Sequence, residues 1–64
     1  MEKVLEYIRK TAYKTALCLD NAQANKNDPE QQKKDIQQAG EFADFVYHSL
    51  IGFQAAMESE VTDG

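Results

Sequence analysis

The second half of the chain repeats apolar residues with the period of a helix. From Ile36 onward, alternating steps of three and four residues pick out Ile36, Ala39, Ala43, Val46, Leu50, Phe53 and Met57. Such steps return to one side of an α-helix, whereas a half-buried strand alternates every second residue. The pattern therefore predicts an amphipathic helix, and its seven-residue repeat is typical of helices that pack side by side.

The first half of the chain carries the same kind of repeat. Its members are Met1, Leu5, Ile8, Ala12, Thr15, Leu19 and Ala22, and Val4 and Ala16 widen the stripe. This repeat predicts a second amphipathic helix. The residues expected to point inward from it are Leu5, Ile8, Ala12 and Leu19.

The only strong break between the two stripes is the segment Asn25-Lys26-Asn27-Asp28-Pro29-Glu30-Gln31. Asp28 is a good N-cap because its carboxylate accepts bonds from the first unpaired N–H groups of a helix. Pro29 suits the first helical position, where its missing N–H is not needed. Gln31 is placed to reach back toward the cap. The segment predicts the end of one helix and the start of the next.

These signals predict a single all-α domain over residues 1–64, folded as an antiparallel helical hairpin. The expected parts are a helix over about residues 2–25, a turn at 26–28, a helix over about 29–58 and a frayed tail at 59–64. The tail is expected to fray because acidic side chains oppose the negative end of the helix dipole.

The second helix is apolar beyond the face that one neighbour covers, because Phe42, Phe45 and Ala56 extend one flank of its stripe and Tyr47 and Ile51 the other. Leaving such side chains in water forfeits roughly 1.5–3 kcal/mol each, a large loss for a chain this short. We therefore expect two hairpins to associate as a homodimeric four-helix bundle. The expected core and interface residues are Leu5, Ile8, Ala12, Leu19, Ile36, Phe42, Ala43, Phe45, Val46, Leu50, Phe53 and Met57.

Two glycines interrupt the second helix at positions 40 and 52. Each costs about 1 kcal/mol relative to alanine inside a helix. A close approach of another helix would explain both, and a bend would explain Gly52. The alternative is that both are tolerated surface glycines.

The residue composition limits the catalytic and metal-binding functions that the chain could have. The chain has one His, one Cys and a net charge of −4, and no spacing for a zinc site, a phosphate loop or a calcium loop. His48 is expected on the outer face beside Glu41 and Asp44, and Cys18 as a small hydrophobe. We therefore expect no catalysis, no cofactor and no metal.

No apolar run reaches the roughly 20 residues of a membrane span, and none resembles a signal peptide, which predicts a cytoplasmic protein.

Tyr13 and Leu17 fall outside the first stripe at the spacing of a contacting pair. They form a candidate docking patch for another, unidentified protein, with Arg9, Lys14 and Asp20 as a polar rim. The alternative is that the pair lies inside the dimer interface.

A separate line on the first helix combines basic residues with an aromatic one: Lys3, Tyr7, Lys10 and Lys14. Such a strip can contact phosphates while Tyr7 stacks on an unpaired RNA base. The alternative is a solvated face with ion pairs to acids of the second helix. The charge of −4 on the whole chain favours this alternative.

Two resemblances bear on function. Tyr7-Ile8-Arg9 before a heptad run, and Ala43-Asp44 followed by Tyr47 and Ser49, resemble the repressor-of-primer family of plasmid copy-number regulators. That resemblance implies a hairpin that dimerises into a four-helix bundle and binds paired RNA loops through its first helices. The segment MEKVLEYIRKTAYKTA is similar to accessory proteins of temperate lambdoid bacteriophages, which implies binding of host regulators.

The function expected from these observations is a small regulatory protein that acts by binding another protein. An RNA-binding regulator of the helical-hairpin type is the first alternative. A structural subunit of a larger assembly is the second.

Overall fold

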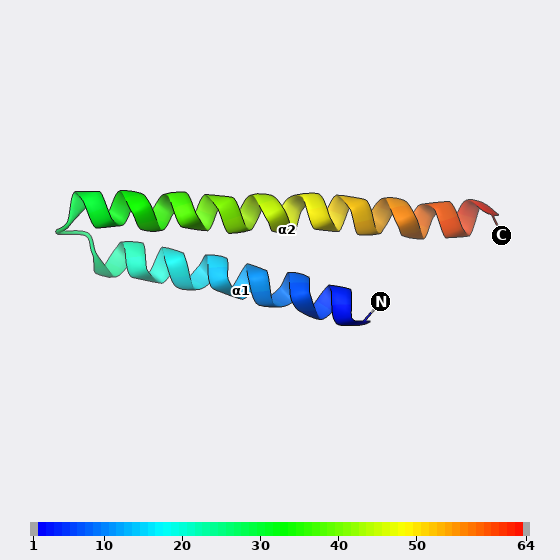
Figure 1. Cartoon of the computed structure of the whole chain (residues 1–64), viewed down its shortest axis with the longest axis horizontal. Helices are drawn as coiled ribbons and strands as arrows, with labels where there is room; N and C mark the ends of the chain where they lie inside the picture. The colour runs from blue at the N-terminus through cyan, green and yellow to red at the C-terminus, as the bar shows by residue number, and fades with distance from the viewer. Residues whose placement is uncertain (1, 64) are drawn as a thin grey trace.

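A computed structural model describes residues 2–63, with side chains for residues 2–59. It consists of two helices, α1 (Glu2–Ala24) and α2 (Pro29–Asp63), joined by a short turn. Figure 1 shows the helices lying side by side and running in opposite directions. The predicted all-α hairpin is therefore confirmed. Within the described range, no helix has the length and apolarity that crossing a membrane requires.

The start of α2 is capped as its sequence predicts. The Asp28 side chain accepts a hydrogen bond from the backbone N–H of Gln31 at 3.3 Å, and its carbonyl accepts one from Gln32 at 2.9 Å. Pro29 is the first helical residue. The Gln31 side chain does not reach back to the cap, since it donates instead to Asp35 Oδ1 at 3.1 Å.

Amide side chains tie the two helices together beside the turn. Asn25 Nδ2 donates to Asp35 Oδ2 at 3.0 Å, and Gln32 Nε2 donates to the carbonyl oxygen of Ala22 at 3.0 Å. The last carbonyls of a helix lack intrahelical donors, so α2 supplies a partner for the end of α1. Polar contacts therefore close this end of the hairpin.

The seam between the helices differs from the expected one. Its buried and half-buried side chains are Ile8, Thr11, Thr15, Cys18 and Ala22 on α1, Asn25 in the turn, and Gln32, Asp35, Ala39, Phe42, Val46, Ser49 and Phe53 on α2. The expected inward positions Leu5, Ala12 and Leu19 are exposed. The same correction applies on α2 to Ile36, Ala43, Leu50 and Met57. Both helices are rotated about their axes relative to the predicted arrangement. At every second predicted position, the residue that comes one place earlier in the sequence therefore lies in the seam.

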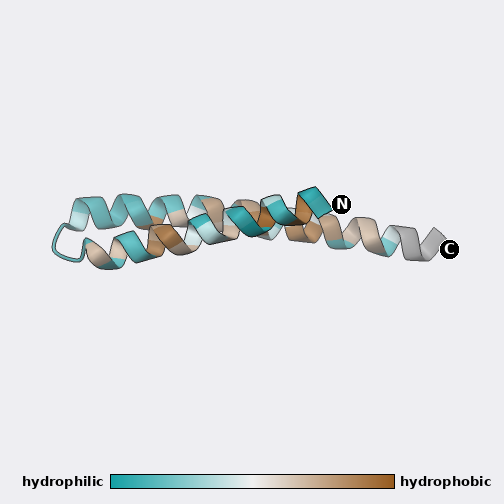
Figure 2. Cartoon of the chain, turned by 90° about the horizontal axis from the view of Figure 1, so that it is seen from below, coloured by the Kyte–Doolittle hydropathy of each residue, from teal (hydrophilic) through white to brown (hydrophobic). Residues whose placement is uncertain are grey.

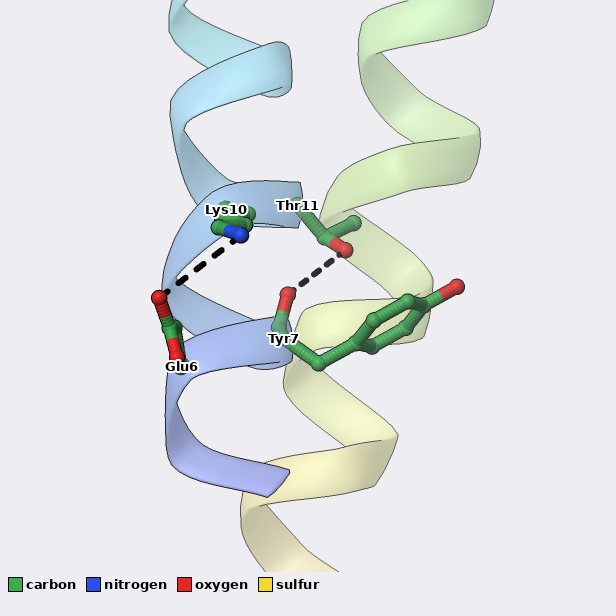
Figure 3. A network of polar contacts seen from close by, with 4 residues as sticks. All are labelled: Glu6, Tyr7, Lys10 and Thr11. Carbon is green, nitrogen blue, oxygen red and sulfur yellow. Dashed lines mark hydrogen bonds and ion pairs between the residues drawn. The ribbon is translucent and has the colours of Figure 1, made fainter. Parts of the chain in front are cut away.

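Local hydrogen bonds and side-chain size explain why this rotation is tolerated. Thr11, which is buried, donates its hydroxyl to the Tyr7 carbonyl at 3.0 Å (Figure 3), and Thr15 donates to the Thr11 carbonyl at 3.2 Å. Because both hydroxyls are paired within α1, placing them against α2 leaves no donor unsatisfied. The rotation also places Phe42 in the seam in place of the much smaller Ala43.

The hairpin has very little core of its own. Its buried apolar residues are Ile8, Ala22 and Ala39, and no described side chain is fully buried. A compact chain of 7.2 kDa exposes about 4,100 Å² of surface, whereas this chain exposes 5293 Å². The radius of gyration is 15.6 Å, against about 11 Å for a compact domain of this length. Most apolar side chains therefore remain in contact with water.

The second helix is longer than expected. It continues to Asp63, so the stretch predicted as a frayed tail is helical over residues 59–63, and Gly64 lies outside the described residues. Acidic residues at a helix end cost only about 0.3–1 kcal/mol each, and no Gly or Pro interrupts the sequence between Phe53 and Asp63. With 35 residues against 23 in α1, α2 extends beyond the start of α1, as Figure 1 shows.

Both glycines of α2 lie in open space. A Cβ atom added at Gly40 or Gly52 would meet no other atom within 4 Å, and α2 continues through both positions. No other part of the described chain therefore approaches α2 at either glycine.

The polar contacts beside the turn lead to a first prediction. Replacing Asp35 by Ala removes the acceptor of two amide side chains, one of them Asn25 in the turn that follows α1. We expect the free energy of unfolding to fall by about 1–2 kcal/mol, measured by urea denaturation. Gln37→Ala, an exposed change on the same helix, should alter it by less than about 0.5 kcal/mol. Equal effects of the two changes would show that these amide contacts do not stabilise the hairpin.

Candidate protein-docking surface

An open groove of about 490 Å³ lies on the outer face of α1. It is lined by Arg9, Lys10, Tyr13, Lys14 and Leu17. These positions recur at helical spacing, so they share one face of α1, away from the seam with α2. We call this surface the α1 groove.

The predicted Tyr13 and Leu17 pair forms the apolar part of the α1 groove. Tyr13 is 64% exposed and Leu17 is 43% exposed. Neither residue belongs to the seam between the helices. The structure thus brings the pair together on a free surface of the single chain.

Three cationic side chains surround this pair. Lys14 Nζ lies 5.9 Å from the centre of the Phe42 ring, and Lys10 Nζ lies 3.6 Å from Glu6 Oε1. Lys10 and Glu6 are both largely exposed, so the pair contributes little to stability. Asp20, expected on the rim, does not line the groove. The α1 groove is therefore apolar at its centre and positive at its edges.

The basic strip does not act as one surface. The Tyr7 ring packs edge-on against Phe45 of α2, with ring centres 5.7 Å apart and planes at 74°. Figure 3 shows this ring extending across α2 while Lys10 points toward Glu6. Lys10 and Lys14 line the α1 groove, but Lys3 and Tyr7 do not. Lys10 pairs with Glu6 of its own helix and Lys14 lies over the Phe42 ring, in place of the ion pairs with acids of α2 that the sequence offered as the alternative.

The two residues with chemically versatile side chains are placed apart. His48 is exposed, with Nδ1 at 2.9 Å from the Asp44 carbonyl oxygen and 3.3 Å from Asp44 Oδ1. Cys18 is half-buried in the seam. Among the described residues, no three potential ligands gather in a way that would hold a metal ion.

A second apolar surface lies beside the seam. It consists of the exposed seven-residue lines Leu5, Ala12 and Leu19 on α1 and Ile36, Ala43, Leu50 and Met57 on α2. We call it the flank face. Figure 2 shows brown, hydrophobic bands along both helices, while the part of α2 nearest the turn is teal. That these residues meet a second chain remains a prediction; within one chain they do not form the seam.

The other predicted interface residues are divided between two places. Ile8, Val46 and Phe53 lie in the seam, together with Phe42. Phe45 is 44% exposed and contacts only the Tyr7 ring among aromatic side chains of the described chain.

Comparison with known proteins gives no relative for this chain. No family model, no curated protein sequence and no solved structure matches it significantly. Its function must therefore be argued from its own surfaces.

Tyr7 and Tyr13 provide a matched pair for a second prediction, because they are 62% and 64% exposed on the same helix. Tyr7→Ala removes the ring contact with Phe45 and should lower the free energy of unfolding by about 1 kcal/mol. Tyr13→Ala should change it by less than about 0.5 kcal/mol. Thermal or urea unfolding followed by circular dichroism measures both. A larger loss for Tyr13→Ala would place that residue in a stabilising interface.

Proposed function

We propose that this protein is a non-enzymatic regulatory protein, a homodimeric four-helix bundle that binds another protein through the α1 groove. The occupant is an acidic amphipathic helix of the partner. The observation that carries the proposal is the α1 groove itself, where an exposed aromatic and aliphatic pair lies among three cations.

The chemistry of the α1 groove fits such a helix. An amphipathic helix presents apolar side chains at steps of three and four residues, which match the spacing of Tyr13 and Leu17. Tyrosine is a common anchor in protein interfaces because a large ring is buried at little conformational cost. Acidic residues beside the partner's apolar stripe would meet Arg9, Lys10 and Lys14 and accelerate encounter.

The exposed surface supports the dimer in this proposal. The chain exposes about 1,200 Å² more than a compact chain of its mass. A stable interface removes about 800 Å² from each partner. Covering the flank face of each chain with a second copy would account for most of this excess and leave the α1 groove free.

The regulatory role rests on the resemblance of the N-terminal segment to phage accessory proteins. RNA binding is the less favoured role, because Tyr7, the residue expected to stack on a base, packs against Phe45. The seven basic residues of the chain are also outnumbered by eleven acidic ones.

A third prediction concerns the mass in solution. Sedimentation equilibrium at micromolar concentration should give twice the 7.2 kDa mass of the chain. Folding and association should be coupled, so the melting temperature should rise with protein concentration. A folded 7.2 kDa species with a concentration-independent melting temperature would contradict the dimer.

A fourth prediction tests the α1 groove. The double change Tyr13→Ala and Leu17→Ser should leave the melting temperature and the mass unchanged but remove capture of the partner from host lysate. Ile51→Ser is the matched control, since Ile51 is 47% exposed on α2, away from the α1 groove. Capture by the wild type and the control should survive nuclease treatment and weaken as salt rises.

Three results of that experiment would contradict the proposal. Loss of capture on RNase treatment would favour the RNA-binding role. Unfolding or dissociation of the double variant would place Tyr13 and Leu17 inside the dimer interface. Equal capture by the double variant and the control would show that the partner binds elsewhere.

A further inference from the structure

We infer that the flank face binds a second copy of this chain in an antiparallel arrangement, with the two turns at opposite ends of the bundle. The inference rests on the homodimer proposed above and adds the surface and the orientation. It is carried by the placement of the exposed apolar lines, the excess surface and the distribution of charge.

Both lines of the flank face lie on the same side of the hairpin. The contact between Tyr7 and Phe45 shows that these two residues flank the seam on one side. Leu5 and Ala43 each precede one of them by two residues, which is about 200° around a helix. Leu5 and Ala43 therefore flank the seam on the opposite side, and the seven-residue steps carry the other members of each line there too.

The contacts between the helices also set the register of the flank face. Tyr7 meets Phe45, and Gln32 meets Ala22. With these pairs fixed, Leu5 lies roughly level with Leu50, Ala12 with Ala43, and Leu19 with Ile36. The flank face thus has large side chains toward both ends and two alanines in its middle.

This order of sizes suits an antiparallel pair centred on the alanine layer. A two-fold axis there places Leu5 and Leu50 of one copy over Leu19 and Ile36 of the other. Small residues meet at the centre, where Gly40 lies one turn from Ile36 and has open space in front of its Cα atom. Two helix backbones can approach closely at such a layer, while the large side chains fill the wider spaces on each side.

The surface that needs covering is large enough for a stable dimer. Each chain has about 1,200 Å² more exposed surface than a compact chain of its mass. Two copies together would bury more than the roughly 1,600 Å² of a standard interface. The members of the flank face include five of the twelve large apolar side chains that the structure leaves exposed.

Charge distinguishes the two orientations of the pair. No basic residue follows Lys34, and the end of α2 carries Glu58, Glu60 and Asp63. A parallel dimer would bring two such acidic ends together, where like charges repel. An antiparallel dimer instead places each acidic end beside the other copy's turn region, where Lys26, Lys33 and Lys34 balance Asp28, Glu30 and Asp35, so that this repulsion is absent.

The length of α2 supports the same orientation. It has twelve residues more than α1 and extends past the start of α1, where the chain offers it no partner helix (Figure 1). From the alanine layer, α2 runs about 30 Å toward its end at Asp63 and about 21 Å toward Pro29. In the antiparallel pair the extension of one copy therefore runs along the turn of the other.

Lysine substitutions at two neighbouring residues of equal exposure test whether the flank face is the dimer interface. Leu50 and Ile51 are each 47% exposed, but only Leu50 belongs to the flank face. Leu50→Lys should raise the dimer dissociation constant by about 100-fold or more, because two apolar contacts are lost per dimer. Ile51→Lys should change it by less than about threefold. Sedimentation over a concentration series measures both constants.

A distance between spin labels tests the orientation. Labels are attached at Asn27→Cys in a Cys18→Ala background whose mass and helicity match the wild type. The turn lies about 22 Å from the alanine layer, so the antiparallel dimer predicts about 45 Å between labels. A parallel dimer predicts less than about 20 Å.

The possible results separate this inference from the proposed function. A monomeric wild-type protein would overturn the dimer and the inference together. A dimer with a short label distance would overturn the orientation alone. A dimer equally sensitive to both lysine changes, or to neither, would overturn the assignment to the flank face, while the α1 groove would still be tested by its own variants.

Discussion

The contact between α1 and α2 buries little apolar surface, and the other properties of the molecule follow from that. The seam is built largely from small or polar side chains such as Thr11, Thr15, Cys18 and Ser49, with Ile8, Phe42 and Phe53 as its larger members. Hydrophobic stabilisation is proportional to the apolar area removed from water, and this seam removes little. Small domains are marginal even with a full core. The hairpin therefore has apolar surface in excess of what its own fold can cover.

The exposed apolar residues are grouped into two separate surfaces. The flank face gathers two seven-residue lines on one side of the hairpin, whereas the α1 groove holds one aromatic and aliphatic pair among cations on the outer side. The two surfaces differ in character, since the first is long and apolar and the second is short and positively charged. A long apolar face suits a permanent interface, while a compact, charged groove suits a partner that binds and leaves. This difference is the reason for assigning self-association to one surface and partner binding to the other.

The turn end is stabilised by a different kind of contact. Asp28 caps α2, Asp35 accepts bonds from two amides, and Gln32 donates to the end of α1. These groups define where the chain reverses and which residues of the two helices face each other, because hydrogen bonds have strict geometry. They bury little apolar surface, so they determine the register of the hairpin more than its stability.

By itself the sequence determined the two helices, the capped turn and the antiparallel hairpin, because helical periodicity and the Asp28-Pro29 signal are local properties of the chain. It also indicated that Tyr13 and Leu17 lie off the seam. Only the tertiary structure decided which of two adjacent stripes forms the seam. Residues one position apart, such as Phe42 and Ala43, differ by about 100° around a helix, and both stripes repeat every seven residues. The choice between them depends on which side chains fit together across the pair, including threonine hydroxyls that bond to their own helix. The sequence signals also did not predict that α2 continues to Asp63, because a weak dipole penalty does not determine where a helix without Gly or Pro near its end stops.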